Sequence, residues 1–203
     1  MPRGRPRKFD TEQALFQAMN LFWQQGYQGT SLDDLSKRMG VTKPSLYAAF
    51  GDKEQLFLKA FDRYSQVYGG RVRQAVAAQT DVYEAVKAYL NTIADILSDV
   101  DNPAGCMWVN STIECHHLGE IIERKIIEHK ARSEAVLYDR LRQAQIEEQI
   151  PIEEDIQALA RFFSSVGNAM AVVAKVHPDP IRIRQMVEIA MRALPVRASI
   201  DSK

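Results

Sequence analysis

The segment best suited to chemistry is residues 103–117, PAGCMWVNSTIECHH, which contains two thiols, Cys106 and Cys115, and two imidazoles, His116 and His117. Thiolate and imidazole are good ligands for zinc and copper. The two cysteines are nine residues apart, which on one helix gives about 13.5 Å of rise and places the sulfurs on opposite sides. A disulfide or a shared metal ion would therefore require a break in that helix. We expect neither a metal site nor any other cofactor.

Cys106 has a second interpretation, in which it acts alone. It falls in the first turn of a helix that the pattern predicts over residues 104–117, where exposed N–H groups and the helix dipole favour a thiolate and lower the pKa of the thiol. On this interpretation Cys106 is a reactive thiol that senses oxidants or electrophiles. The alternative is a small thiol buried in the core. The sequence leaves both interpretations open.

The charge of the chain is balanced in total and uneven in distribution. Lys and Arg number 26, and so do Asp and Glu. Residues 1–60 carry nine basic and six acidic side chains, which gives 9 − 6 = +3 and leaves −3 for the remainder. Any attraction to a polyanion must therefore come from the N-terminal part of the chain.

Several classes of function lack support in the sequence. No pairing of nucleophile with base and no phosphate-binding loop is present, so we expect no enzyme. Two cysteines are too few for a disulfide framework, and no charged-then-apolar leader opens the sequence, which favours the cytoplasm. The longest weakly polar stretch, residues 169–176, is far shorter than the ~20 residues that span a bilayer. We therefore expect no membrane partner.

The elements that must position these residues are helices. Apolar residues recur at helical spacing along almost the whole chain, and no segment alternates as a strand does, which predicts an all-α fold. Capping residues and glycines predict helices from Asp10 to Gly26, from Ser31 to Gly40, from Thr42 to Phe50 and from Lys53 into the seventies. Proline and glycine breaks separate further predicted helices over 82–99, 104–117, 120–148, 153–176 and 180–193.

The second and third predicted helices are joined through Met39-Gly40-Val41-Thr42. This is the geometry of a helix-turn-helix, in which glycine permits the sharp turn and the second helix enters the major groove of DNA. The side chains expected to face inward are Leu32, Leu35, Val41, Leu46 and Phe50. Those expected to face solvent or DNA are Lys43, Pro44, Ser45, Tyr47 and Ala48. From the turn alone, an ordinary helical hairpin is an equal alternative.

Residues 26–57, GYQGTSLDDLSKRMGVTKPSLYAAFGDKEQLF, resemble the DNA-binding signature of the TetR/AcrR repressor family. The resemblance implies a tetracycline-repressor-like protein with a DNA-binding domain and a larger helical domain for effector sensing and dimerisation. It implies base-reading or groove-wall positions at Thr42, Lys43, Pro44 and Ser45, and phosphate contacts at Thr30, Tyr47 and Lys53. Many members have a polar residue where this chain has Ala48-Ala49, so base contacts there should be fewer or made to thymine methyls.

A basic arm, PRGRPRK, precedes the first helix and resembles the AT-hook. In such an arm the arginines, here Arg3, Arg5 and Arg7, lie in a narrow A·T minor groove. The alternative is a disordered basic tail attracted to any polyanion. In either case we expect that deletion of residues 1–8 flattens the salt dependence of DNA binding by one to a few phosphate equivalents.

The resemblance also implies that the last two long helices pair with those of a second subunit. Within residues 153–176 the small residues expected to make that contact are Ser164, Gly167, Ala171 and Ala174, with intramolecular packing as the alternative. An effector pocket is expected among the helices from residue 60 to 175. The side chains expected to line it or to sense the effector are Tyr64, Tyr68, Tyr89, Cys106, Met107, Trp108, Asn110, Phe163 and Met170.

Together these observations predict a dimeric transcriptional regulator with no enzymatic activity. The family resemblance implies that it is a repressor, with activation as the alternative. We expect a basic arm at residues 1–8, a helix-turn-helix domain at 9–57 and an effector-sensing and dimerisation domain at 58–203. The expected partners are a pseudo-palindromic operator, a second copy of the chain, and a small-molecule or thiol-reactive effector that releases the DNA. The alternatives are a nucleoid-type architectural protein, and a helical enzyme or carrier with an incidental helical hairpin.

Overall fold

The computed structural model describes residues 10–114 and 119–195, so the basic arm and Cys115, His116 and His117 lie outside the described residues. Within those ranges no group of three or more His, Cys, Asp and Glu side chains is arranged to hold a metal ion. The same ranges contain no strand, and the all-α prediction is confirmed. The helices are α1 (Thr11–Gln25), α2 (Leu32–Met39), α3 (Lys43–Phe50), α4 (Lys53–Ala77), α5 (Val82–Ser98), α6 (Met107–Glu114), α7 (Glu120–Ile146), α8 (Ile156–Val176) and α9 (Pro180–Met191).

Short polar side chains begin the first helices where the sequence predicts. The Asp10 carboxylate accepts N–H groups in the first turn of α1. Ser31 and Asp34 form a reciprocal capping box at the start of α2, and Thr42 caps α3. These bonds satisfy N–H groups that a helix leaves unpaired at its start. Gly26 ends α1 with φ 75° and ψ 176°, a conformation almost restricted to glycine.

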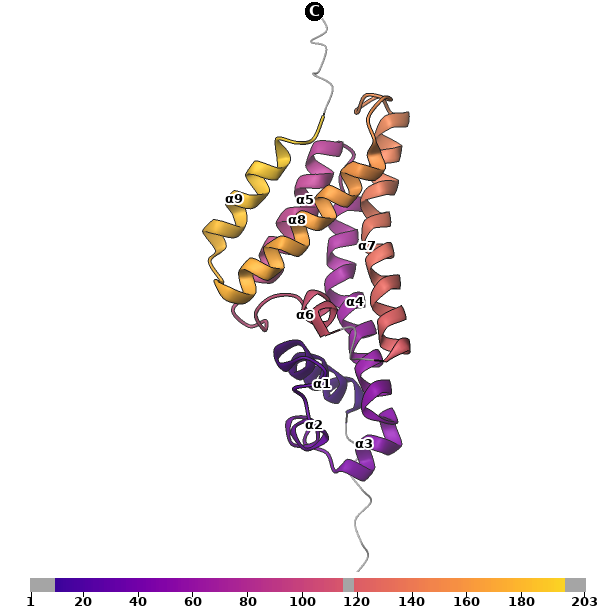
Figure 1. The fold of residues 1–203 in the computed structure, drawn as a ribbon, viewed down its shortest axis with the longest axis vertical. Helices are drawn as coiled ribbons and strands as arrows, with labels where there is room; N and C mark the ends of the chain where they lie inside the picture. Colours follow the sequence, from indigo (N-terminus) through magenta and orange to yellow (C-terminus); the bar gives the residue numbers. More distant parts are fainter. Residues whose placement is uncertain (1–9, 115–118, 196–203) are drawn as a thin grey trace, which may run out of the picture.

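Figure 1 shows a head, which consists of α1, α2, α3 and the first turns of α4, at one end of the molecule. The remaining helices and the rest of α4 form a larger body. Helix α4 belongs to both parts, because it packs on α1 in the head and on α5 and α7 in the body. The domain boundary predicted between residues 57 and 58 falls inside this helix. Head and body therefore share a continuous helix.

Aromatic side chains fill the core of the head. The Phe57 ring of α4 meets Phe22 of α1 edge to face, with 5.1 Å between ring centroids, and meets Tyr27 in the same way at 5.2 Å. Around them lie the side chains predicted to face inward, of which Leu35, Leu46 and Phe50 are buried and Leu32 and Val41 are half-buried. This part of the core prediction is confirmed.

The small residues of α8 pack inside the body. Ser164, Gly167, Ala171 and Ala174 are all buried within this one chain. A Cβ on Gly167 would stand 2.9 Å from Cδ1 of Ile93, so the glycine is what allows α5 to approach α8 this closely. The four residues form an intramolecular packing face. This corrects the prediction that they contact a second subunit.

Two helices of the body begin later than the sequence predicts. Helix α6 begins at Met107 and not at residue 104, because Gly105 has a φ of 79° that a helix does not tolerate. Cys106 is therefore the residue before α6, and its carbonyl accepts the N–H of Asn110 at 2.9 Å. Helix α8 begins at Ile156 and not at 153, because a turn occupies residues 152–154.

Helix α8 is the only one in the described ranges that is long and apolar enough to cross a membrane by length and composition, a segment that the sequence analysis did not identify. Only 33% of the apolar window is buried inside this chain. The buried side packs on α5, α7 and α9. Helix α8 is thus apolar on two sides. One side is buried inside this chain, and the other is exposed.

Candidate nucleic-acid interface and effector cavity

The helix-turn-helix consists of α2, a turn at Gly40, and α3. Gly40 has φ 67° and ψ 30°, a left-handed conformation that glycine adopts without steric cost. After the turn, the Val41 N–H donates to the Ser36 carbonyl at 3.1 Å, and the Ser36 hydroxyl donates to the Val41 carbonyl. These bonds fix the angle between the two helices, so that one face of α3 packs on the head and the other faces solvent.

The solvent-facing side of α3 carries the predicted reading residues. Ser45 is half-buried, and the exposed residues are Thr42, Lys43, Pro44 and Tyr47. The Lys43 ammonium lies 2.7 Å from the carboxylate of Asp33 on α2, and both side chains are largely in solvent. An ion pair of this kind contributes at most about 1 kcal/mol. The ammonium can therefore move to a phosphate or a base edge at little cost.

Two positions predicted to hold phosphates contact other parts of the head. Thr30 is completely buried, and its hydroxyl donates to the Gly26 carbonyl at 2.6 Å. Its side chain therefore closes the turn after α1, which corrects the predicted phosphate contact. Lys53, at the start of α4, has its ammonium 4.3 Å from the centre of the Tyr27 ring, a cation–π contact that holds it beside the head.

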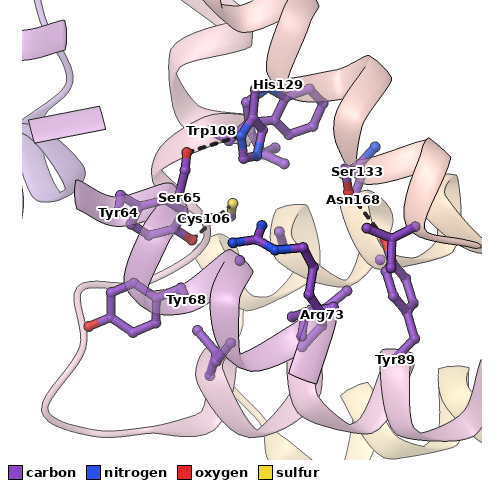
Figure 2. Close-up of a pocket in the computed structure, with 18 of the residues that line it drawn as sticks. Tyr64, Ser65, Tyr68, Arg73, Tyr89, Cys106, Trp108, His129, Ser133 and Asn168 are labelled. Atoms are coloured by element: carbon purple, nitrogen blue, oxygen red, sulfur yellow. Dashed lines mark hydrogen bonds between the residues drawn. The ribbon is translucent and has the colours of Figure 1, made fainter. Parts of the chain in front are cut away.

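The body contains a cavity of about 130 Å³ between α4, α5, α6, α7 and α8 (Figure 2). The predicted side chains that line this cavity are Tyr64, Tyr68, Tyr89, Cys106 and Trp108. Those that do not are Met107, Phe163 and Met170, which are completely buried in the core, and Asn110, which bonds to α1. The last four are corrected from lining to supporting positions.

Cys106 places its thiol at the wall of the cavity, where the Tyr64 hydroxyl donates to its sulfur at 3.2 Å (Figure 2). Burial raises the pKa of the Cys106 thiol and outweighs the hydrogen bonds from Tyr64 and from the N–H groups of Val109 and Trp108, which lower it. This direction is opposite to the one that the reactive-thiol interpretation predicts, and it agrees with the alternative of a buried thiol. The start of α6 acts on the thiol as predicted, but desolvation dominates, and the protonated thiol reacts slowly.

His129 of α7 also lines the cavity, where it lies beside Trp108 and Ser65 (Figure 2). The Ser65 hydroxyl donates to the Phe61 carbonyl and also lies 3.0 Å from Nδ1 of His129. Because a hydroxyl has one proton, Nδ1 of His129 is the donor in the second contact. Burial, together with the nearby positive charges of Arg132 and Arg73, lowers the pKa of His129 to about 4. The imidazole is therefore neutral at neutral pH.

The sequence analysis missed the polar residues that α4 and α7 contribute to the cavity, namely Ser65, Arg73, His129, Arg132 and Ser133. A signal was present in α4. The Gly69-Gly70 pair lies in the middle of a predicted long helix, where glycine is strongly disfavoured. Such a pair indicates a place where another group approaches the helix closely, and Gly69 does line the cavity.

Two hydrogen bonds tie α1 of the head to the segment that begins α6. The Trp23 indole N–H donates to the Gly105 carbonyl at 3.1 Å, and the Asn110 amide donates to the Trp23 carbonyl at 3.2 Å. The Trp23 ring also meets Tyr64 and Tyr68 edge to face, at 4.9 and 5.0 Å between centroids. Helix α1 therefore contacts the wall of the cavity directly.

A second hollow, of about 620 Å³, lies between α6, α7 and α8. Its lining includes the exposed side chains of Ile127 and Val172 and the ion pair between Arg161 and Glu134, at 3.3 Å. It shares Trp108 with the first cavity. This hollow lies at the surface beside α8. The first cavity, called the aromatic cavity below, reaches the interior of the body.

A helix-turn-helix with an exposed reading face, joined through one helix to a hollow helical body, defines a DNA-binding transcriptional regulator. Residues 14–60 match the family described as bacterial regulatory proteins, tetR family. Residues 82–190, more than half of the chain, match the tetracyclin repressor-like C-terminal domain. The chain belongs to the TetR family, as the sequence resemblance predicts.

Known regulators are similar to this chain along almost its full length. The HTH-type transcriptional repressor ComR of Escherichia coli K12 is 33% identical over 194 residues, which cover 95% of this chain and 92% of ComR. The uncharacterised regulator YezE of Bacillus subtilis is 30% identical over 94% of this chain and 99% of YezE. A cysteine mutant of the TetR-family regulator CifR, solved with 26-base-pair operator DNA, superimposes with a TM-score of 0.88 at 31% identity, over 95% of this chain and 100% of that one. These relatives are regulators and not enzymes, so the enzyme alternative is set aside.

Proposed function

We propose that this protein is a homodimeric repressor that binds a pseudo-palindromic operator in the cytoplasm and is released by an effector in the aromatic cavity. The observation that carries the proposal is the position of Trp23, which bonds to the start of α6 and also packs on Tyr64 and Tyr68 of the cavity wall. Two α3 helices would occupy successive major grooves ~34 Å apart. A change in the cavity would alter that spacing through Trp23.

The proposed dimer surface is the outer face of α8 together with α9. Exposed residues of α8 recur at positions 158, 162, 165, 169, 172 and 176, a spacing of four and three that marks one face of a helix. On this face Phe162, Val172 and Val176 are 43%, 49% and 68% exposed in the single chain. Ile181 and Ile189 on α9 are 69% and 64% exposed. A second copy of both helices would cover this apolar surface as a four-helix contact.

The dimer is tested by Phe162→Glu, with the molar mass measured by sedimentation. A buried charge in the contact should give a monomer and a large loss of operator affinity. The matched control is Val100→Glu, because Val100 is 96% exposed between α5 and α6 and outside the proposed surface. A dimeric Phe162→Glu protein, or equal dissociation of the control, would place the contact elsewhere.

Release follows from preferential binding. An effector lowers operator affinity only to the extent that it binds the released state more tightly than the DNA-bound state. In the cavity it would press on Tyr64 and Tyr68, which pack on Trp23 of the head. The head would then tilt together with α1 and α4.

Cys106 supplies a second route of release, by a thiol-reactive effector. Its sulfur faces the cavity, which favours an adduct there, while its raised pKa slows the formation of one. The test is the rate of iodoacetamide labelling of the native protein, with operator affinity measured before and after in wild type and in Cys106→Ser. Labelling of Cys106 that weakens DNA binding only in the wild type supports this route. Protection of Cys106 in the native state leaves a reversible small molecule as the effector.

The operator is tested by recovering bound DNA across the genome and footprinting the recovered sites. A regulator should protect a two-fold symmetric site and prefer it over random DNA by ~10³ or more. A nucleoid-type protein would show little sequence preference. Repression is then read from transcription of the adjacent gene, which should rise when the protein is removed.

A further inference from the structure

Arg73 of α4 stands at the aromatic cavity without a carboxylate beside it. Figure 2 shows its guanidinium directed into the cavity. Other cations of the body form ion pairs, as Arg132 does with Glu128 at 3.4 Å and Lys125 with Asp62 at 2.7 Å. Over residues 10–114 and 119–195, no ion pair within 4.0 Å involves Arg73. Its five N–H donors are therefore open to an acceptor from outside the chain.

The Gly69-Gly70 pair makes room for this guanidinium. A Cβ on Gly69 would stand 3.3 Å from Nη1 of Arg73, tighter than an ordinary contact, and a Cβ on Gly70 would stand 3.8 Å from Nη2. The arginine thus lies back along its own helix, four residues from Gly69, and reaches the cavity that Gly69 also lines. Two glycines inside a helix are otherwise unfavourable, so this arrangement gives them a role.

The charged groups that line the cavity are all basic. They are Arg73 and Arg132, and no carboxylate is present among the described lining residues. His129 lines the cavity as well, but it adds no charge at neutral pH because its pKa is lowered. Arg132 is partly compensated by Glu128. The uncompensated positive charge of the site is therefore that of Arg73.

The remainder of the lining sets the shape of the ligand. It is mostly aromatic and aliphatic, with hydroxyls on Tyr64, Tyr89 and Ser133. The volume of about 130 Å³ is close to the ~150 Å³ of an engineered apolar cavity that holds one benzene molecule. A guanidinium binds a carboxylate through two parallel hydrogen bonds. Arg73 is exposed, so it can meet such a group at the mouth while the ligand body enters the cavity.

We infer that the cavity binds a small organic monocarboxylate with a compact apolar body of about one ring, whose carboxylate pairs with Arg73. The inference rests on the proposed function, since it names the chemical class of the effector expected in this cavity. It also predicts discrimination against neutral and cationic molecules of the same shape, because those leave the guanidinium without an anionic partner.

The test is calorimetric binding of benzoate, benzamide and benzylamine to the DNA-free dimer. Benzoate should bind at least about tenfold more tightly than its near-isostere benzamide, and benzylamine should bind weakest. In Arg73→Gln the preference for benzoate should disappear. The matched control is Arg71→Gln, which removes the same charge from an exposed residue of α4 that does not line the cavity, and it should keep the preference. Gly69→Ala should weaken benzoate binding, whereas Gly70→Ala should not.

Equal affinity for benzoate and benzamide, an equal loss in Arg71→Gln, or no detectable benzoate binding would overturn the inference. Operator affinity is measured separately, with and without benzoate. Benzoate that binds through Arg73 and leaves operator affinity unchanged would support the ligand class and refute the role of the cavity in release. If none of the probes binds but operator binding persists, the ligand class is refuted and the proposed function as a DNA-binding regulator stands.

Discussion

The head and the body use aromatic side chains in opposite ways. In the head, the rings of Phe22, Tyr27 and Phe57 pack against one another and fill the space between α1 and α4. In the body, Tyr64, Tyr89 and other rings stand around a space of about 130 Å³ and leave it open. A filled core gains contacts from every atom of its lining, whereas a hollow one forfeits contacts on the open side.

The head and the body of this chain thus meet different requirements. The head must hold α3 in a single orientation, and dense packing provides that rigidity. On the proposed function the body must also accommodate an effector, and binding of that effector would add to the stability of the folded protein.

Truncating an aromatic residue should destabilise the head more than truncating a cavity wall destabilises the body. Phe57 is completely buried among other rings, so Phe57→Ala should lower the free energy of unfolding by about 3–5 kcal/mol. Ile93 is half-buried and faces the cavity on one side, so Ile93→Ala should cost about 2 kcal/mol or less. Urea denaturation measures both values. Equal losses would mean that the cavity wall is packed as tightly as the head.

Removing the reading side chains should disable the head without unfolding it. Lys43 and Tyr47 are exposed on α3 and make no contribution to its core. The double variant Lys43→Ala/Tyr47→Ala should weaken operator binding about a thousandfold, since contacts to DNA are each worth about 1–3 kcal/mol. Its melting temperature should stay within about 2 °C of wild type, because surface substitutions change stability little. A variant that binds the operator normally, or that melts early, would contradict the assignment.

Acid should weaken the body before the head. The pKa of His129 is about 4 in the folded protein and 6.5 ordinarily, so the unfolded chain takes up a proton that the folded chain refuses. Stability should therefore fall as pH drops from about 6.5 to about 4, by about 2 kcal/mol after discounting for partial exposure. Three nearby cations disfavour protonation of His129, namely Arg132, Arg73 and Lys125, and the Asp62 carboxylate favours it.

In the head, hydrogen bonds from Ser31 lower the pKa of Asp34 below its ordinary 3.8. The stability that this cap contributes is present above pH 3.8 and is lost only at lower pH. Denaturant titrations from pH 7 to 4 should thus show a loss that His129→Gln abolishes. A loss of the same size in His129→Gln would trace the acid sensitivity to other groups.

The smallest effect is expected at the junction of head and body. Asn110→Ala removes the hydrogen bond to the Trp23 carbonyl and should lower stability by about 1 kcal/mol. It should also reduce, by a few-fold, the ratio of operator affinities measured without and with a ligand in the cavity. Thr112→Ala is the matched control, because the Thr112 hydroxyl bonds only to a carbonyl within α6. A reduced ratio in both variants would point to loosening of α6 and not to the bond with Trp23.

Local features of the head were predictable from the sequence. Ser31, Thr42 and Gly40 each act on neighbours within a few residues, through caps and a left-handed turn. Such interactions depend on sequence spacing alone. Thr30 is an exception in the head: the family resemblance implies a phosphate contact there, but the burial of Thr30 is decided by α1 and the following turn together.

The body was predictable only in outline, because its properties depend on helices far apart in the sequence. The dipole argument for Cys106 was sound, yet the sign of its pKa shift is set by desolvation from packed helices. Helix α8 carries small residues on one face and larger apolar ones on the other. Periodicity identifies both faces but does not say which of them lies inside the chain.

The length of α4 between the head and the glycine pair has a mechanical consequence. Gly69 lies 16 positions after Lys53 on this helix, which is about 24 Å of stiff rod at a rise of 1.5 Å per residue. A rotation of about 5° around the paired glycines would displace the far end by ~2 Å, which is a large fraction of the tolerance for docking in a groove. On the proposed function, this helix, which borders the cavity, would act as a lever that turns about the two glycines. A small distortion beside a bound effector would then be magnified at the surface that reads DNA.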